Sequence, residues 1–348
     1  MTEAPVLEVR DLRVVLHTEA GDLTAVDGVS FSVPAGRTLA LVGESGAGKS
    51  MTSLALMRLV GKGPRGQGAS LSGQVWLDTA PGGPGPSGSS SRVELLGAPL
   101  AEMQALRGRS LAMVFQEPMT SLNPVFRVGW QIAEAIVRHE GVGAPAAEQR
   151  ALEMLKLVGI PDPQARMRAY PHELSGGMRQ RAMIAMALAC RPRLLIADEP
   201  TTALDVTVQA QVLALMRRLQ RELGTALLFV THDLGVVAQM ADEVAVMYAG
   251  RIVEHAGVQA IFGAPRHPYT AGLLKSMPSV VARPDGAMVE PIRGSMPPLA
   301  RLPAGCAFHP RCDHAQEGRC ARAMPDLLEV ASGHRVRCAR AAEIEVSR

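Results

Sequence analysis

The stretch Gly43-Glu44-Ser45-Gly46-Ala47-Gly48-Lys49-Ser50 decides how this sequence is interpreted. It fits the pattern G-x-x-x-x-G-K-[ST], in which a glycine-rich loop surrounds the phosphates of a nucleotide with backbone N–H groups. Lys49 then reaches the β and γ phosphates, and the Ser50 hydroxyl binds Mg²⁺. The apolar run 39–42 predicts a buried parallel strand before the loop, and residues 51–57 predict the helix after it. This context indicates a nucleotide site.

The composition limits the class of protein. A chain of 348 residues has room for a full core and a second, smaller domain. The hydrophobic content of 47% and the charged content of 20% are typical of a globular protein. A formal charge of +3 and an aromatic content of 3% argue against nucleic acid as the main partner. The sequence has no apolar run of about 18 residues and no export signal, so we expect it in the cytosol or on the cytosolic face of a membrane.

Polar residues follow several apolar runs of strand length. The runs and their endings are 111–115 at Gln116, 194–197 at Asp198 and Glu199, and 226–230 at His232. The carboxyl ends of parallel strands meet at one edge of a sheet, where ligands bind. We therefore expect these side chains to gather around the phosphate loop.

Other segments predict the elements between these strands. Strands are expected at 6–16, 23–33, 71–77 and 93–96, and helices at 132–158 (interrupted at 141–144), 175–189 and 205–223. Residues 80–91 form a Gly/Pro/Ser-rich loop to which we assign no chemistry.

A second motif specifies the class of nucleotide-binding protein. Leu174-Ser175-Gly176-Gly177-Met178-Arg179-Gln180 lies before the 194–199 strand and resembles the signature sequence of the ATP-binding-cassette (ABC) ATPases. The resemblance covers nearly the whole chain. It implies an α/β fold, with a P-loop NTPase (RecA-like) core, an antiparallel β subdomain, a helical signature subdomain and a small Cys-rich C-terminal domain. The implied domains are the ATPase at 1–262, with the helical subdomain at about 125–190, and a C-terminal extension at 263–348.

The resemblance also implies a role for each site residue. Glu199 would polarise the attacking water, as a base or as an electrostatic aligner, while His232 contacts the γ phosphate. The catalytic set is Glu199, His232, Gln116 and Lys49, and the Mg²⁺ ligands are Ser50, Gln116 and Asp198. The ATP contacts are Gly43, Glu44, Ser45, Gly46, Ala47, Gly48, Lys49, Ser50, Met51 and Gln116. Phosphoryl transfer needs positioning and charge neutralisation, which these residues supply.

In the resembled family, ATP is bound between two subunits arranged head to tail. Ser175, Gly176, Gly177 and Asp205 would contact the ATP held by the phosphate loop of a second ABC ATPase subunit. Residues 203–205 would cross that interface, so hydrolysis would require the partner. The family also stacks an aromatic residue on adenine, but this chain has Val15-Leu16-His17 there. Two alternatives follow: His17 or Leu16 packs on the base instead, or His17 is exposed to solvent and has no role.

Within the family, the chain resembles the peptide-importer ATPases of bacteria. Tyr170-Pro171-His172-Glu173, residues 117–124 and residues 266–270 carry this likeness. It implies an ATPase subunit that powers uptake of di- or oligopeptides, at the cytoplasmic face of the bacterial inner membrane. The partners would be a second ATPase subunit in a heterodimer, two transmembrane permease subunits and, indirectly, a substrate-binding protein. Importers of nickel or a glycoside, and more remotely an ABC ATPase acting on nucleic acid, remain alternatives.

A cysteine cluster marks the C-terminal extension. Cys306, Cys312, Cys320 and Cys338 have the spacing C-x5-C-x7-C-x17-C, which permits zinc or iron–sulfur equally. The importer resemblance implies that they ligate a [4Fe–4S] cluster, with zinc as the alternative. We expect nearby arginines to offset the thiolates, namely Arg311, Arg319, Arg322, Arg335 and Arg337. His309 and His314 are expected to be solvated, and Cys190 to be a buried apolar residue.

Overall fold

The structure is a computed structural model that describes residues 5–60, 68–79, 92–117, 121–202, 204–277 and 291–344. The predicted loop at 80–91, Pro118, Met119, Thr120 and Ala203 lie outside the described residues. The chain divides into two compact units. Unit one comprises Met1–Glu8, Ser32–Arg37 and Trp76–Phe229, and unit two comprises Val9–Phe31, Thr38–Val75 and Val230–Arg348. The predicted domain boundary at 262/263 stays a prediction.

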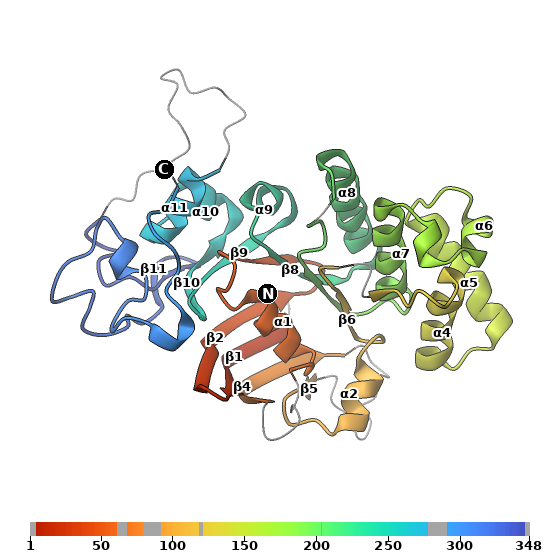
Figure 1. The fold of residues 1–348 in the computed structure, drawn as a ribbon, viewed down its shortest axis with the longest axis horizontal. Helices are drawn as coiled ribbons and strands as arrows, with labels where there is room; N and C mark the ends of the chain where they lie inside the picture. Colours follow the sequence, from red (N-terminus) through yellow and green to blue (C-terminus); the bar gives the residue numbers. More distant parts are fainter. Residues whose placement is uncertain are drawn as a thin grey trace, which may run out of the picture. The chain divides into compact units, whose positions relative to one another are not determined.

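The sheet of unit two contains the strand that leads into the phosphate loop. β3 (Thr38–Val42) is buried along its whole length and pairs in parallel with β9 (Glu243–Tyr248). β10 (Arg251–Gly257) then pairs antiparallel with β9 (Figure 1). β12 (His334–Val336) and β11 (Leu328–Ala331) extend the order to β11-β12-β10-β9-β3. The C-terminal residues thus continue the same sheet as β3.

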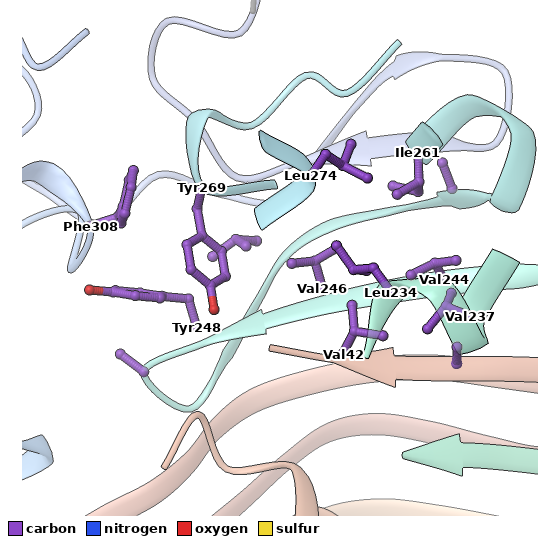
Figure 2. Close-up of a cluster of buried hydrophobic side chains, with 14 of the residues drawn as sticks. Val42, Leu234, Val237, Val244, Val246, Tyr248, Ile261, Tyr269, Leu274 and Phe308 are labelled. Atoms are coloured by element: carbon purple, nitrogen blue, oxygen red, sulfur yellow. The ribbon is translucent and has the colours of Figure 1, made fainter. Parts of the chain in front are cut away.

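The helices of unit two are α1 (Lys49–Leu56), α9 (Leu234–Met240), α10 (Val258–Gly263) and α11 (Pro268–Lys275). An apolar core joins this sheet to α9, α10 and α11. The core cluster includes Val42, Val246, Tyr248 and Tyr269 (Figure 2). Phe308 lies between the short 3₁₀ helices η3 (Leu299–Arg301) and η4 (His309–Arg311). Its ring packs on Tyr248 and Tyr269, with both centroid distances 5.3 Å, so the C-terminal segment is part of this core.

The predicted antiparallel strands are confirmed. β1 (Pro5–Thr18) and β2 (Gly21–Pro34) are neighbours, and β4 (Gly68–Asp78) lies on the other side of β1. In unit one, the end of β4 pairs antiparallel with β5 (Arg92–Glu94), with Trp76 opposite Glu94.

Unit one combines parallel strands with a helical region. β6 (Leu111–Val114) and β7 (Leu194–Asp198) are fully buried and parallel, and β8 (Ala226–Thr231) begins in unit one beside β7. The helices are α2 (Leu100–Leu106), α4 (Val128–Glu140), α5 (Ala144–Leu157), α6 (Pro163–Arg168), η2 (Pro171–Glu173), α7 (Gly176–Leu188) and α8 (Val206–Leu223). Gly141, at φ 68°, ends α4 and separates it from α5, so the predicted interruption at 141–144 is confirmed. Among the residues that the structure describes, no helix is both long and apolar enough to span a bilayer.

A fully buried carboxylate ties the C-terminal strands to the rest of unit two. Glu254 on β10 accepts hydrogen bonds from the backbone N–H groups of Arg266 (2.7 Å) and His267 (3.0 Å). Its other contact is with His334 Nε2 on β12, at 2.7 Å. Three partners around one buried carboxylate offset its desolvation cost.

We expect Glu254→Ala to lower the free energy of unfolding of unit two by about 3 kcal/mol, because it leaves buried donors without an acceptor. A thermal melt of the full chain measures this as a fall of several degrees. Glu329→Ala, on the exposed strand β11, is the matched control and should change stability by less than about 0.5 kcal/mol. Equal effects of the two substitutions would contradict the role given to Glu254.

Candidate active site

The phosphate loop follows β3 and depends on glycine at two positions. Gly43 has φ 155°, and a Cβ atom there would lie 2.2 Å from the carbonyl oxygen of Met247 on β9. Gly48 has φ 104°, and its Cβ would lie 2.6 Å from the carbonyl oxygen of Ala25. Neither position accepts a side chain without moving the backbone. The loop is therefore shaped by the strands packed around it.

Lys49 begins α1 and folds back over the loop. It is only 4% exposed, and its Nζ donates to the carbonyl oxygens of Gly43 (2.8 Å) and Glu44 (3.1 Å). Ser50 and Met51 follow in the first turn of α1, where backbone N–H groups and the helix dipole favour an anion. Ser45 and Gly46 are exposed at the tip of the loop, while Ala47 is buried. The loop thus offers one ammonium group and backbone N–H groups to phosphates. The N–H groups of Glu44 and Ala47 are the exceptions, because they donate to the Tyr269 hydroxyl (2.8 Å) and to the Glu44 carbonyl oxygen (3.2 Å).

The structure brings Gln116 and Glu199 together within unit one. β6 and β7 are adjacent, and Gln116 Nε2 donates to Glu199 Oε2 at 3.1 Å. Thr202 Oγ1 donates to the same oxygen at 3.0 Å, and Asp198 is the buried last residue of β7. Glu199 has φ 47°, a left-handed conformation that costs about 1–2 kcal/mol for a residue other than glycine. Such strain is typical of functional positions, where the surrounding structure fixes a side chain.

His232 is the predicted residue of the last strand. It follows β8 directly, lies in unit two and is exposed. Asp233 beside it caps α9 by accepting from Gly235 N (2.8 Å) and Val236 N (3.4 Å). His232 thus lies at a fixed strand-to-helix corner.

The signature residues form an exposed helix start in unit one. Ser175 caps α7, and its Oγ accepts from Met178 N at 3.3 Å. Gly177 faces α8 so closely that a Cβ would lie 2.7 Å from Val208 Cγ1. Asp205 caps α8, with Oδ1 accepting from Val208 N at 2.9 Å. The structure thus brings the predicted residues Ser175, Gly176, Gly177 and Asp205 to one surface.

The observed contact of His17 does not support the expected packing of this residue on adenine. His17 Nδ1 contacts Asp22 Oδ1 at 2.7 Å across the β1–β2 turn. This pair occupies the polar end of the His17 side chain. Packing of Leu16 or His17 on a base stays a prediction.

The four C-terminal cysteines converge. Cys306, Cys312, Cys320 and Cys338 line one cavity of about 20 Å³. Burial raises the pKa of Cys312 to about 11, and it also raises the pKa of Cys306 and Cys338. These three thiols are therefore protonated at neutral pH, and a metal would have to displace their protons.

Histidines also line this cavity, which corrects one expectation. His309 and His314 were predicted to be solvated, but both are half-buried at the cavity. His267 lines it as well, and burial lowers its pKa to about 4. Its Nδ1 accepts from Tyr269 N at 3.1 Å, so the proton of the neutral ring is on Nε2. That buried Nε2–H has no hydrogen-bond partner within the described part of the chain.

The side chains around the cavity are of the chemical types that bind a metal or cluster, but their positions do not match a binding site. Four thiols could supply the ligands of a metal or cluster, and the His267 N–H could donate a hydrogen bond to the bound group. Within the described ranges, however, no group of three or more His, Cys, Asp or Glu side chains is arranged so that it could hold a metal ion.

The arginines are used differently from the prediction. The positive charges of Arg319 and Arg340 lower the pKa of Cys338 and so oppose the effect of burial, which raises it. The expectation is wrong for Arg311, whose guanidinium pairs with Glu44 of the phosphate loop. It is also wrong for Arg335, which contacts His255, and for Arg337, which donates to the carbonyl oxygens of Ile252 (2.9 Å) and Pro325 (2.8 Å).

Sequence reasoning missed the contacts that the phosphate loop makes with the C-terminal region. Glu44 N donates to the Tyr269 hydroxyl at 2.8 Å, and its carboxylate pairs with Arg311. Tyr269 lies in the 266–270 segment, which the sequence marks only as a likeness to peptide importers. Nothing local indicates a partner more than 200 residues away.

Comparison with known proteins places the chain in a family. Residues 26–202 match the family described as ABC transporter, and residues 253–320 match the family described as oligopeptide/dipeptide transporter, C-terminal region. A Brucella melitensis protein, provisionally named as an ATP-binding protein of peptide import, is 51% identical over 348 residues, covering 99% of both chains. The oligopeptide transport ATP-binding protein OppD of Salmonella typhimurium is 48% identical, covering 97% of this chain and 95% of its own.

A solved structure supports the fold. A dimeric ATP-binding cassette in a post-hydrolysis state, bound to ADP and Pi, aligns with a TM-score of 0.60 and 22% identity. The alignment covers 72% of this chain and 98% of that one. The predicted P-loop NTPase fold is confirmed. This chain belongs to the ABC transporter family and is one of its ATP-binding subunits, of the oligopeptide/dipeptide type.

Proposed function

We propose that this chain is the ATP-hydrolysing subunit of an ABC importer that powers the uptake of di- or oligopeptides. The Glu199 carboxylate carries the proposal, because Gln116 and Thr202 hold it one residue after the buried Asp198. The relatives named for peptide import and oligopeptide transport match nearly the whole chain, including the C-terminal region.

In the proposed mechanism, each residue binds or orients a reacting group. The loop N–H groups and Lys49 bind the phosphates, and Ser50, Gln116 and Asp198 would hold Mg²⁺, which would neutralise phosphate charge. Glu199 orients the attacking water, as a base or as an aligner, and its hydrogen bonds from Gln116 and Thr202 fix the direction of the carboxylate. His232, exposed beside β8, contacts the γ phosphate and completes the set.

We expect Glu199→Gln to lower the rate of ATP hydrolysis by a factor of roughly 10² or more. Peptide uptake by the membrane complex should be lost with it. The glutamine keeps an oxygen for Gln116 and Thr202 but cannot take a proton, so ATP binding should persist. Light scattering of the chain mixed with its partner ATPase subunit and MgATP should detect a trapped dimer. Phosphate release and uptake of labelled peptides by reconstituted vesicles measure the other two effects.

Glu222→Gln is the matched control, since Glu222 is an exposed residue of α8 that pairs with Arg218 across one turn. It should leave hydrolysis and uptake unchanged. Full hydrolysis by the Glu199→Gln variant, or by monomeric wild type with no dimer, would refute the mechanism. Normal hydrolysis without peptide uptake would refute only the substrate.

We further propose that a second ABC ATPase subunit, in a heterodimer, closes over the ATP of this chain. The exposed helix start at Ser175 and Gly176 lies beside the α8 start, where Val206 is 85% exposed. An exposed apolar residue next to free helix N–H groups suits a surface that is covered by a nucleotide and a partner.

Ser175→Arg should therefore leave ATP binding within about twofold while removing dimer formation and hydrolysis. The arginine obstructs the surface, and loss of the cap costs only about 1 kcal/mol. The measurements are equilibrium binding of a fluorescent ATP analogue and light scattering of the chain mixed with its partner ATPase subunit. Asp162→Ala, which removes the cap of α6 (Oδ1 to Ala165 N, 3.4 Å), is the matched loss of a cap. Normal dimerisation of Ser175→Arg would exclude this surface.

Two transmembrane permease subunits are the proposed membrane partners, at the cytoplasmic face of the bacterial inner membrane. Phe126 and Trp130 stack with ring centroids 4.4 Å apart, and both are exposed. Gln131 fixes the loop that presents them, because its amide group bonds Asn123 N (2.9 Å) and the carbonyl oxygens of Asn123 (3.0 Å) and Phe126 (2.9 Å). A rigid exposed aromatic pair suits a helix from a permease subunit. A substrate-binding protein would act indirectly, through the permease.

For the cysteine cavity we propose a [4Fe–4S] cluster, with zinc as the alternative. The convergence of four thiols and the unpartnered His267 donor support a bound group. Thiolate ligation in a buried, largely apolar site suits a structural or sensing role.

We expect anaerobically purified chain to contain iron and acid-labile sulfide in equal amounts, with visible absorbance that air bleaches. Cys320→Ser should lower the iron content, because Cys320 is a proposed ligand. Cys190→Ser should not, because Cys190 lies in unit one and does not line the cavity. Stoichiometric zinc would replace the iron proposal, and a metal-free preparation with four reactive thiols would contradict both.

A further inference from the structure

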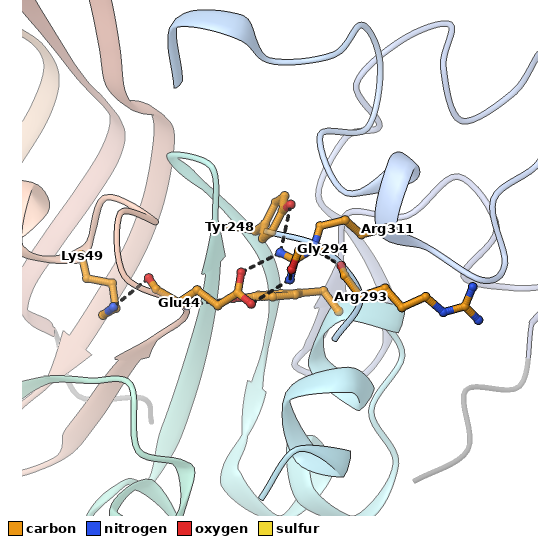
Figure 3. A network of polar contacts seen from close by, with 7 residues as sticks. Glu44, Lys49, Tyr248, Arg293, Gly294 and Arg311 are labelled. Atoms are coloured by element: carbon orange, nitrogen blue, oxygen red, sulfur yellow. Dashed lines mark hydrogen bonds and ion pairs between the residues drawn. The ribbon is translucent and has the colours of Figure 1, made fainter. Parts of the chain in front are cut away.

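Glu44 of the phosphate loop forms hydrogen bonds or ion pairs through its N–H group, its carbonyl oxygen and its carboxylate. The Glu44 N–H donates to the Tyr269 hydroxyl at 2.8 Å, and its carbonyl oxygen accepts from Lys49 Nζ at 3.1 Å. Its carboxylate forms a two-pronged ion pair with Arg311, at 2.6 and 2.9 Å (Figure 3). Residues from α11 and from the C-terminal segment thus hold the loop in place.

Arg311 is built into its position. Its side chain is 6% exposed, and all its donor groups are used. Nε donates to the Arg293 carbonyl oxygen (2.8 Å), Nη1 to Glu44 and the Tyr248 hydroxyl (3.4 Å), and Nη2 to Glu44 and the Gly294 carbonyl oxygen (3.3 Å). The guanidinium carbon also lies 5.8 Å from the ring centroids of Tyr248 and Phe308. Only the planar fork of arginine satisfies this set.

The negative charge of Glu44 makes its pairing with Arg311 important for phosphate binding. A phosphate loop must accept a polyanion, and a free carboxylate on the loop would repel it. Arg311 cancels that charge and holds the carboxylate on the side of Tyr248, away from Lys49 Nζ, which lies at the carbonyl end of Glu44 (Figure 3). The ion pair is mostly shielded from water, so salt screens it less than a surface pair.

The backbone that carries Arg311 is also fixed. Arg311 ends η4, and its N–H donates to the carbonyl oxygen of Phe308 at 2.9 Å. Phe308 is anchored in the core of unit two. The guanidinium therefore reaches Glu44 from a rigid support.

We infer that Arg311 is a positioning residue for ATP binding, which neutralises Glu44 and holds its carboxylate away from the phosphates. The C-terminal region is thereby part of the nucleotide site. This inference rests on the proposed ATPase function.

The test is the dissociation constant for ATP of the full chain, measured by calorimetry at a temperature where circular dichroism shows each variant to be folded. Arg311→Ala should weaken ATP binding about tenfold, because it releases a charged carboxylate onto the loop. Glu44→Ala/Arg311→Ala should bind ATP several-fold more tightly than Arg311→Ala, since no carboxylate is left to repel the phosphates. Both variants lack the structural contacts of Arg311, so a merely structural role predicts equal affinities.

Arg319→Ala is the matched control, because Arg319 forms an ion pair with Glu343 (2.5 Å) in the same region without contacting the loop. It should bind ATP within about twofold of wild type. Wild-type affinity in Arg311→Ala, or no recovery in the double variant, would overturn the inference alone. Failure of wild type to bind ATP would overturn the proposed function and this inference with it.

Discussion

The close approach of backbone to backbone at the phosphate loop is the constraint on which unit two depends. The carbonyl oxygen of Met247 occupies the space that a Cβ of Gly43 would need, at 2.2 Å. Because Met247 lies on β9, the shape of the loop is set by a strand about two hundred residues later in the chain, and β9 is in turn held by β10 and the apolar core. A loop that binds phosphates through fixed N–H groups gains affinity from this rigidity, because little ordering remains to be done on binding.

The two units contribute different chemistry. Unit two contains the phosphate loop, His232 and the cysteine cavity, and unit one contains the Gln116–Glu199 pair and the exposed starts of α7 and α8. The phosphate-binding loop and the proposed partner surface thus belong to different compact units, whereas the residues proposed for Mg²⁺ and the attacking water come from both. The left-handed backbone of Glu199 places strain at the residue proposed to orient that water.

Local signals in the sequence predicted most of the fold, and long-range pairing explains what they missed. The glycine pattern, the caps at Ser175 and Asp205 and the buried runs of β3, β7 and β8 act within a few residues, so their positions could be predicted. Past His255 the prediction was weak, because α10 and α11 are short and β11 is exposed on both faces, which leaves no hydrophobic period. The partner of Arg311 could not be predicted either. Because Arg311 is adjacent to Cys312 in the sequence, it suggests a pairing with the cysteine thiolates. In the structure, the packing of Phe308 in the core places Arg311 beside Glu44 instead.

Continuity along one short segment links the cysteine cavity to ATP binding. Residues 306–312 contain two of the cavity thiols, the core residue Phe308 and, at the end of η4, Arg311. The Cys306 carbonyl oxygen accepts from His309 N (2.9 Å), and the His309 carbonyl oxygen accepts from Cys312 N (3.2 Å), so backbone hydrogen bonds connect the two ends of this turn. Two of the cavity-lining thiols and the partner of Glu44 therefore belong to one hydrogen-bonded turn of chain, which is anchored in the core by Phe308.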